Sequence, residues 1–370
     1  MTPPPTSVDL PLVTGAWREG DPVGSRRFID IGSVDLESGA TLPDVRVAYE
    51  TWGEFTGDNA VLVEHALTGD AHVVGPVGPG HRSPGWWDDL VGPGRAIDTD
   101  RWFVVATNIL GGCQGTTGPA SLAPDGEPWG SRFPALTVRD QVSAEIAVAD
   151  ALGIERWQAV TGGSAGGMRA LEWAIARPDR VERLFLLATS ASASAEQIAY
   201  SSTQQAAITA DPDFRGGDYY AAARGPVTGL ALARRIAHIA YRSEPELAER
   251  FGREVQDDGR FAVTSYLDHH GAKLVQRFDA NSYLVLTRAM DTHDVGRGRG
   301  GVESALARIT ASTIVAGIDS DRLYPLSQQQ VLADQIPGSR GLEVVQSLHG
   351  HDGFLVESAQ VGALATKLLG

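Results

Sequence analysis

The sequence predicts an α/β fold with a mostly parallel central sheet, helices on both faces and a helical insertion. Three observations support this fold class. Short apolar runs rich in Val, Ile and Leu recur along the chain, and several lack the alternation of half-exposed strands, which is typical of strands buried on both faces. Helical patterns lie between these runs, as in alternating βα units. The alternation stops over one long internal stretch that carries only helical patterns.

Seven predicted strands define the sheet. They cover residues 45–49, 60–63, 102–106, 157–161, 184–188, 313–316 and 342–345. A helix is expected from about Thr137, which can cap it, to Leu152, with Val142, Ile146 and Ala149 on the same face. A second helix is expected to begin just after Ser164.

The interruption of the βα pattern predicts the domain organisation. Helical segments are expected near residues 195–210, 229–241, 244–251 and 282–290, and a glycine-rich run at 296–301 closes the stretch. We therefore predict an α/β core formed by residues 1–193 and 303–370, with a helical lid insertion at 194–302. The lid is expected over the C-terminal edge of the sheet, where open α/β sheets bind their ligands.

Composition excludes several classes of function. The 370 residues carry 31 Lys and Arg against 46 Asp and Glu, a formal net charge of −15. This balance argues against nucleic acid and against anionic membrane surfaces as partners. The single cysteine, Cys113, excludes a disulfide within the chain. Residues 1–12 lack the apolar run of a signal peptide, and no segment approaches the length of a membrane span, so we expect a cytoplasmic protein.

The strongest chemical signal is a G-x-S-x-G match at residues 162–166, centred on Ser164. It lies directly between a predicted strand and a predicted helix. A nucleophile on such a tight turn needs small neighbours, and its hydroxyl then projects above the sheet near a helix N-terminus. A plain glycine-rich turn is the alternative, but the flanking strand and helix favour a nucleophilic serine.

A serine nucleophile needs a histidine base oriented by a carboxylate. In enzymes with this elbow the chain order is serine, acid, histidine. Asp321 follows the predicted strand at 313–316, and His351 follows the one at 342–345. Asp319 and His349 are close competitors for the two roles. His351 is favoured because glycines bracket it and a helix is expected to start at residue 354.

An oxyanion formed during acyl transfer needs two backbone N–H donors. The expected donors are Ala165, directly after the nucleophile, and Leu67, in the loop after the strand at 60–63. The glycine-rich stretch 111–118 lacks the Gly-Lys-Ser/Thr ending of a phosphate-binding loop, so a structural loop lining the pocket is expected. The histidines show no spacing typical of metal ligands, and we expect no metal site.

Together these segments resemble the homoserine O-acetyltransferase family over nearly the whole chain. The matching segments are residues 49–53, 65–72, 84–87, 108–119, 162–173, 320–325 and 350–354. One departure is Ala165, where members of the family often have Leu. The resemblance implies an α/β-hydrolase fold with a helical lid, a homodimer paired through the lids, and a role in methionine biosynthesis.

The resemblance also implies the substrates and their binding residues. It implies a ping-pong cycle in which acetyl-CoA is the co-substrate, L-homoserine is the acceptor and no cofactor is bound permanently. Arg234 would bind the homoserine carboxylate, Tyr241 would add a hydroxyl, and Asp352 would hold the amino group. For Arg234 the alternative is a solvated charge, since Arg224 and Arg235 lie close in sequence.

Three other functions remain open on sequence grounds. Homoserine or serine O-succinyltransferases would use the same fold and triad with another donor or acceptor. A serine esterase or thioesterase would use water as the acceptor. A lid that carries Arg234 argues against this function. A catalytically inactive binding protein is disfavoured by the intact Ser, Asp and His set.

Overall fold

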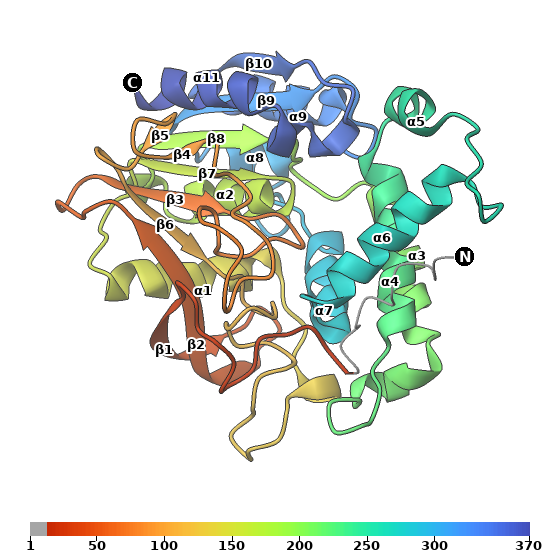
Figure 1. The fold of residues 1–370 in the computed structure, drawn as a ribbon. Coiled ribbons are helices and arrows are strands. Elements are labelled where there is room, and N and C mark those ends of the chain that lie inside the picture. The colour runs from red at the N-terminus through yellow and green to blue at the C-terminus, as the bar shows by residue number, and fades with distance from the viewer. Residues whose placement is uncertain (1–12) are drawn as a thin grey trace.

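The computed structural model describes residues 13–370, and its centre is an eight-stranded sheet in the order β1-β2-β6-β3-β7-β8-β9-β10 (Figure 1). Its strands are β1 (Arg27–Asp35), β2 (Thr41–Trp52), β3 (Ala60–Glu64), β6 (Phe103–Thr107), β7 (Ala159–Gly163), β8 (Arg183–Leu187), β9 (Ser312–Ile318) and β10 (Ser339–Val345). From β6 to β10 every neighbouring pair is parallel, whereas β2 is antiparallel to both β1 and β6. The fold is therefore α/β with a mostly parallel sheet. The first twelve residues, predicted to carry no signal peptide, lie outside the described part.

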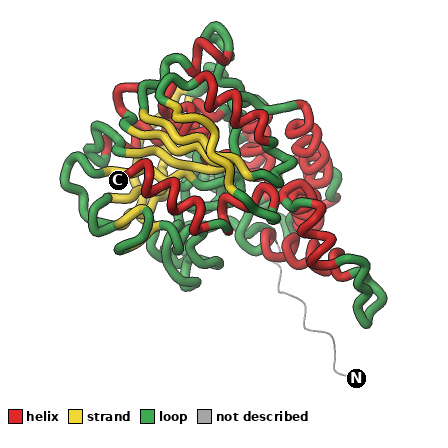
Figure 2. The backbone as a smooth tube through the Cα atoms, turned by 90° about the horizontal axis from the view of Figure 1, so that it is seen from above, coloured by secondary structure: helices red, strands yellow, loops and turns green. Residues whose placement is uncertain are grey.

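Helices cover both faces of this sheet, as Figure 2 shows from above. The helices of the core are α1 (Val138–Ala151), α2 (Ala165–Ala176), α8 (Val302–Leu306), α9 (Leu326–Gln335), α10 (Gly353–Val356) and α11 (Ser358–Leu369). Short 3-10 turns are η1 (Gly130–Arg132), η2 (Pro178–Arg180) and η4 (Gly350–Asp352), and β4 (Val91–Gly92) pairs separately with β5 (Ile97–Asp98). One apolar cluster joins the sheet to α1, α2, α8 and α9. A second joins the opposite face to α11 and the β4–β5 region.

Two predictions about where helices begin are confirmed. Thr137 caps α1 through a capping box in which its side chain accepts the backbone N–H of Asp140 and the Asp140 carboxylate accepts the N–H of Thr137. The helix predicted after Ser164 is α2. The strand predicted at 157–161 is shifted, because β7 starts at Ala159 and continues through both Gly162 and Gly163.

The stretch between β8 and α8 folds as helices that pack on one another beside the sheet edge (Figure 1). They are α3 (Ala195–Thr209), η3 (Pro212–Gly217), α4 (Val227–Tyr241), α5 (Glu244–Phe251), α6 (Ala262–Val275) and α7 (Ala280–Asp291). The sequence analysis located α3, α4, α5 and α7 but did not predict α6. A third apolar cluster joins α3, α4, α6 and α7 to Leu67 and Ala165, so these helices rest on the loops that carry the predicted oxyanion donors.

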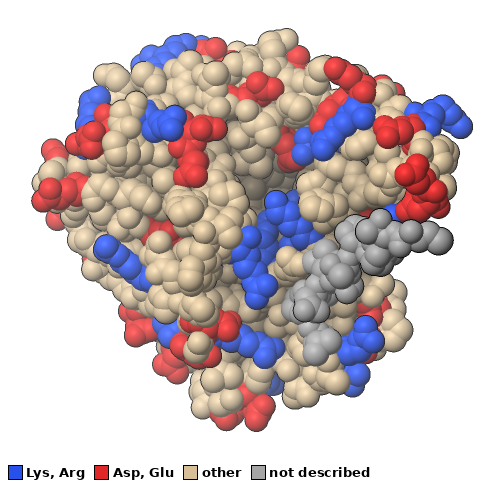
Figure 3. All heavy atoms as spheres, in the orientation of Figure 1, with Lys and Arg blue, Asp and Glu red and all other residues tan. Residues whose placement is uncertain are grey.

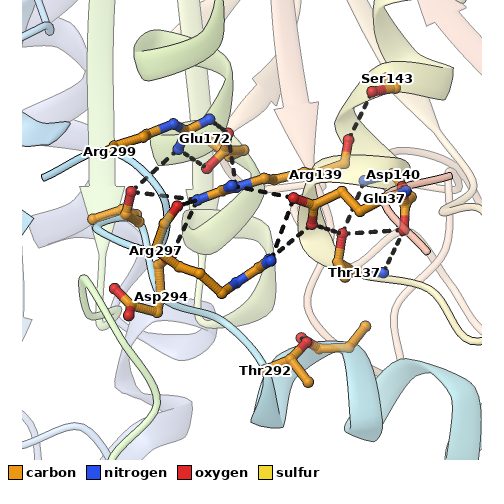
Figure 4. Close-up of polar contacts among 12 residues, drawn as sticks. Glu37, Thr137, Arg139, Asp140, Ser143, Glu172, Thr292, Asp294, Arg297 and Arg299 are labelled. Carbon is orange, nitrogen blue, oxygen red and sulfur yellow. Dashed lines mark hydrogen bonds and ion pairs between the residues drawn. The ribbon is translucent and has the colours of Figure 1, made fainter. Parts of the chain in front are cut away.

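An ion-pair cluster fastens the end of the helical stretch to the core (Figure 4). Glu37, in the β1–β2 turn, pairs with Arg139 of α1 at 3.1 Å and with Arg297 at 2.7 Å. Arg299 donates to Glu172 of α2 at 2.8 Å, and Arg139 donates to the Arg297 carbonyl at 2.7 Å. The glycine-rich run 296–301 is thereby tied to both α1 and α2.

Between residues 13 and 370, no helix is long and apolar enough to cross a bilayer.

Candidate active site

Ser164 occupies a strained turn between β7 and α2. Its backbone dihedrals are φ 56° and ψ −123°, a region that non-glycine residues rarely adopt and that functional sites often hold under strain. A Cβ on Gly166 would lie 2.2 Å from the Glu64 carbonyl oxygen, and one on Gly162 would lie 2.4 Å from the backbone of Gly166. The two glycines are therefore required for β3 and β7 to lie close to the start of α2. The turn raises the Ser164 side chain at the C-terminal edge of the sheet.

His351 and Asp321 form a buried hydrogen bond at the same edge. Nδ1 of His351 lies 2.6 Å from Oδ2 of Asp321, while Oδ1 accepts the backbone N–H groups of Leu323 and Tyr324, each at 2.9 Å. Burial disfavours the imidazolium, but the charge and hydrogen bond of Asp321 outweigh it and raise the pKa of His351. With Nδ1–H donated to the carboxylate, Nε2 is the nitrogen left to act as a base.

The competing acid and base lie in other environments. Asp319 accepts the backbone N–H of Ser347 at 2.9 Å. His349 is partly exposed, and its Nδ1 lies 3.2 Å from Glu246 of α5. The geometry thus pairs Asp321 with His351 and separates the two alternatives from that pair.

Aromatic side chains fix the orientation of the His351 ring. Tyr324 stacks on it with ring centroids 4.9 Å apart, and Phe354 and Tyr241 lie at 5.4 and 5.8 Å. Among residues 13–370, no hydrogen bond joins Ser164 Oγ to His351, whose hydrogen bond to Asp321 is formed. Catalytic hydrogen bonds of this kind are often long or poorly aligned until substrate is bound. Sequence reasoning gave Tyr324 no role, although it belongs to the segment 320–325.

The loop that carries His351 packs closely against the backbone at the end of α4. Gly350 has φ 62°, and a Cβ there would lie 2.5 Å from the carbonyl oxygen of Tyr241. Only glycine combines this conformation with this contact at low cost. The loop that carries His351 therefore touches the end of α4 directly.

The predicted oxyanion donors lie in one buried cluster. Leu67 and Ala165 belong to the same apolar group, and Ala165 is the first residue of α2. His65 supports the Leu67 loop: its Nδ1 donates to the Ala66 carbonyl at 2.7 Å, and its Nε2 accepts the N–H of Ile109 at 3.2 Å. Burial, assisted by the charge of Arg169, lowers the pKa of His65 to about 3. A neutral histidine thus holds this loop.

Two arginines that form no ion pair among residues 13–370 both contact Thr68, the next residue of that loop. Arg234 Nη1 donates to the Thr68 hydroxyl at 3.2 Å, and Arg277 Nη1 donates to the Thr68 carbonyl at 2.6 Å. The Arg234 guanidinium lies 5.4 Å from the centroid of the Tyr241 ring. Arg234 and Tyr241 are therefore brought to the site as a pair, whereas Arg277 was missed because no motif surrounds it.

Asp352 has a partner that the sequence did not reveal. Its carboxylate lies 3.1 Å from Arg242 Nη2, and Arg242 also contacts Glu246 at 3.0 Å. Asp352 follows His351 directly, so its charge lies near the base. The structure joins this core loop to the α4–α5 corner through the Asp352–Arg242 ion pair.

A buried network of charged side chains, centred on Arg169, connects α2 to the core. Arg169 is fully buried and contacts Glu64 at 2.7 Å and Glu145 at 3.1 Å, and it also donates to the His65 carbonyl at 3.0 Å. Burial and the neighbouring Glu64 raise the pKa of Glu145. The network links the nucleophile helix to the loop of the predicted oxyanion donors.

Around Cys113 the glycine-rich stretch 111–118 forms a tight loop. A Cβ on Gly118 would lie 2.1 Å from the carbonyl oxygen of Gly112. Burial raises the pKa of the Cys113 thiol, which leaves it protonated and unreactive. Gln114 at the loop lines a pocket of about 260 Å³ together with Asp70, Arg82 and Arg277.

Basic side chains gather beside a hollow in the face of the molecule seen in Figure 3. The chain has fewer basic than acidic residues, so this group of Lys and Arg makes the surface beside the hollow locally basic. It gives an anionic substrate a favourable approach that the net charge alone does not.

One group of possible metal ligands was not recognised from sequence spacing. Candidate ligand atoms of Glu50, His72 and His81 lie within 4.8 Å of one another, all buried. Nδ1 of His72 lies 3.0 Å from Glu50, and the Ser25 N–H donates to His81 Nε2 at 2.9 Å. The two rings stack 3.7 Å apart at 12°. A metal lies in the plane of the imidazole that binds it, so rings stacked in this way cannot direct nitrogens at one ion unless one ring rotates.

A family model and similar proteins of known name both match most of this chain. Residues 59–357 match the family described as alpha/beta hydrolase fold. The homoserine O-acetyltransferase of Thermobifida fusca (strain YX) is 62% identical over 374 residues, covering 98% of both chains. That of Clavibacter michiganensis subsp. michiganensis (strain NCPPB 382) is 60% identical, covering 98% of this chain and 97% of its own.

Solved structures extend the comparison to two activities. Homoserine O-acetyltransferase from Bacillus anthracis has a TM-score of 0.85 at 26% identity, covering 93% of this chain and 97% of its own. Esterase E22 has the same TM-score and identity, covering 93% and 99%. The same backbone is thus found in acetyl transferases and in an esterase.

Proposed function

The chain belongs to the α/β-hydrolase fold family and, within it, to the homoserine O-acetyltransferases, and from this membership we propose that it transfers acetyl from acetyl-CoA to L-homoserine by a ping-pong route through acetyl-Ser164. The observation that carries the route is the buried His351–Asp321 hydrogen bond of 2.6 Å at the sheet edge that also holds the Ser164 turn. No permanently bound cofactor is needed for this chemistry.

The first half-reaction acylates the serine. His351 Nε2 takes the Ser164 proton as Oγ attacks the thioester carbonyl, and Asp321 stabilises the imidazolium that forms. The N–H groups of Leu67 and Ala165 stabilise the oxyanion. When the tetrahedral intermediate collapses, the C–S bond breaks and the coenzyme A thiolate takes the proton from His351.

The second half-reaction uses the same groups in the same order. The homoserine γ-hydroxyl gives its proton to His351 Nε2 and attacks the acetyl carbon. Collapse of this intermediate breaks the bond to Ser164 Oγ, which recovers the proton from His351. O-acetylhomoserine leaves, and the free enzyme is regenerated.

Homoserine binding is assigned to Arg234, Tyr241 and Asp352. The Arg234 guanidinium suits the planar α-carboxylate as a bidentate partner, and its contact with Thr68 places it next to the Leu67 loop. Tyr241 contacts both Arg234 and His351 through its ring. Asp352 would hold the ammonium group while sharing its charge with Arg242.

We extend the proposal to the role of residues 194–302 as a lid and as a dimer surface. The third apolar cluster supports the lid, because it closes these helices onto Leu67 and Ala165. Exposed Ile198 on α3, and Leu232 and Ile239 on α4, support a lid-to-lid homodimer. A cytoplasmic location agrees with the single, unreactive cysteine.

Ester hydrolysis is the second candidate, since esterase E22 shares the fold at 26% identity. In that reaction water would replace homoserine at acetyl-Ser164. Two features favour transfer. The relatives at 55–62% identity are named homoserine O-acetyltransferases, and Arg234 and Arg277, which form no ion pair among residues 13–370, both contact Thr68. Acetyl transfer to homoserine is therefore better supported than ester hydrolysis.

Initial-rate kinetics test the proposed route. Coenzyme A release is followed by a thiol reagent while acetyl-CoA and homoserine are varied together. Parallel double-reciprocal lines are expected, because the donor product leaves before the acceptor binds. Intersecting lines would contradict the acyl-enzyme route, and equal release without homoserine would assign an esterase.

A further inference from the structure

A small cavity adjoins the catalytic serine on the side of the lid helices. Its volume is about 50 Å³, which gives room for about four water-sized groups. Its walls on the core side include Leu67, Met168 and Tyr324, and Tyr241 of α4 also lines it. Met168 N–H donates to the Ser164 carbonyl at 3.1 Å. Each of these wall residues is adjacent to the proposed nucleophile, base or oxyanion donors.

The stereochemistry of acyl transfer assigns an occupant to this cavity. In the tetrahedral intermediate the carbon carries Ser164 Oγ, the oxyanion, the thiolate or homoserine oxygen, and the acyl chain. The oxyanion faces the N–H groups of Leu67 and Ala165, and the leaving and entering atoms both occupy the position next to His351 Nε2. The acyl chain must therefore point to a fourth region, and the cavity lined by Leu67, Met168 and Tyr324 is the space beside the Ser164 turn that could receive it.

The far wall of the cavity carries a carboxylate. Asp291, at the end of α7, lines it, and Asp291 Oδ2 accepts hydrogen bonds from Ser201 at 2.9 Å and Gln205 at 2.8 Å. No ion pair to Asp291 is formed by a basic side chain within residues 13–370. Burial raises the pKa of this carboxyl, although both hydrogen bonds oppose that shift. When ionised, Asp291 gives this wall of the cavity a negative charge, which the nearby Arg288 stabilises without forming an ion pair to it.

Resting on the proposed function, we propose that this cavity is the acyl-chain subsite and that Asp291 makes it select against donors whose acyl group ends in a carboxylate. An acetyl methyl occupies little of the cavity and stays away from Asp291. A succinyl chain reaches further and brings a second carboxylate toward half-buried Asp291, where the two like charges repel. Short uncharged acyl chains are the class of substrate that the cavity accepts.

Acylation of Ser164 measured donor by donor tests the charge. Protein is mixed at pH 8 with acetyl-, n-valeryl- or succinyl-CoA, and rapid quenching with intact-mass detection gives each acylation rate. The n-valeryl chain is close to succinyl in length but uncharged. We expect succinyl to be at least tenfold slower than n-valeryl. In Asp291→Asn the ratio of succinyl to n-valeryl rates should rise at least tenfold, with the acetyl rate unchanged within about threefold.

Two further variants separate charge from shape. Glu249→Gln removes one exposed lid carboxylate on α5 and should keep the wild-type ratios. Ala193→Leu fills the cavity, of which Ala193 is a lining residue, and should slow n-valeryl at least tenfold while sparing acetyl.

Three outcomes would overturn the inference. An unchanged succinyl-to-valeryl ratio in Asp291→Asn, with normal acetylation, would remove the selectivity role and leave the proposed function intact. A raised KM for homoserine in that variant, with no change in donor ratio, would move Asp291 to acceptor binding. Failure of every donor to acylate wild-type protein would instead contradict the acyl-serine route itself.

Discussion

Asp321 contributes to the site by controlling one ring nitrogen of His351. Its hydrogen bond fixes the tautomer, and its charge raises the pKa of His351. The reaction needs neutral His351, so kcat/KM should rise with pH through the pKa of His351 in the free enzyme, above the ordinary value. Asp321→Asn removes the charge, so that pKa falls and the rising limb moves to lower pH.

The same variant should lose roughly 10³–10⁴-fold in kcat, because Asn favours the wrong tautomer. A pH–rate profile of wild type and Asp321→Asn checks both effects. Asp319→Asn is the matched control, since its carboxylate contacts Ser347 instead. A large loss in the control and a small one in Asp321→Asn would exchange the two assignments.

Arg234 is expected to serve the second half-reaction. Arg234→Ala should raise the KM for homoserine by about 10- to 100-fold, which is the range expected for hydrogen bonds to a charged group. The burst of acyl-enzyme formation with acetyl-CoA should persist, because the first half-reaction does not use the carboxylate site. Stopped-flow thiol release measures the burst, and Arg235→Ala on the same helix is the control. Loss of the burst would mean that Arg234 supports the Thr68 loop in acylation.

At the scale of elements, α2 depends on a charge network that only the tertiary structure creates. Arg169→Met removes the cation between Glu64 and Glu145, which are buried on either side of it. Breaking a buried ion pair leaves an uncompensated charge and costs about 3–5 kcal/mol. Urea unfolding should therefore show a loss of that size, and adding Glu64→Gln and Glu145→Gln should recover part of it. A loss below 1 kcal/mol in the single variant would contradict this role.

The sequence predicted the buried strands better than the edges and the lid. Continuous apolar runs identified the parallel strands, whereas β1 is a half-exposed antiparallel edge with charged Asp30 and an irregularity at Gly32, so it carries no such run. Helix α6 contains Gly271 and two adjacent histidines, which blur its apolar face. β7 extends through Gly162 and Gly163, where the turn at Ser164 leaves no room for a Cβ. In the sequence, the same two glycines resemble a turn.

The candidate site was predictable where a local motif carried it. Ser164, Asp321 and His351 each follow a strand in a recognisable segment. Tyr324, Arg242 and Arg277 were not predictable, because their roles come from contacts between segments far apart in the chain. The Asp352–Arg242 ion pair, for example, joins the η4 turn to the α4–α5 corner, and no spacing in the sequence encodes it.

At the scale of the whole molecule, the exposed apolar residues on α3 and α4 bear on assembly. Leu232 and Ile239 are seven residues apart and so share one face of α4. If the lids pair, the double variant Leu232→Glu, Ile239→Glu should shift the protein from dimer to monomer in light scattering. Val331→Glu, an exposed apolar position on α9, is the control. A monomeric wild type, or a dimeric double variant, would contradict lid pairing.

Trapping the acyl-enzyme shows whether Ser164 carries the acetyl group during transfer. Wild-type protein and Ser164→Ala are mixed with acetyl-CoA, weighed as intact proteins, and then chased with homoserine. We expect a gain of one acetyl group on Ser164 in wild type only, discharged by homoserine to give O-acetylhomoserine. Acetylation that persists in Ser164→Ala, or an adduct that homoserine does not discharge, would contradict the acyl-serine route.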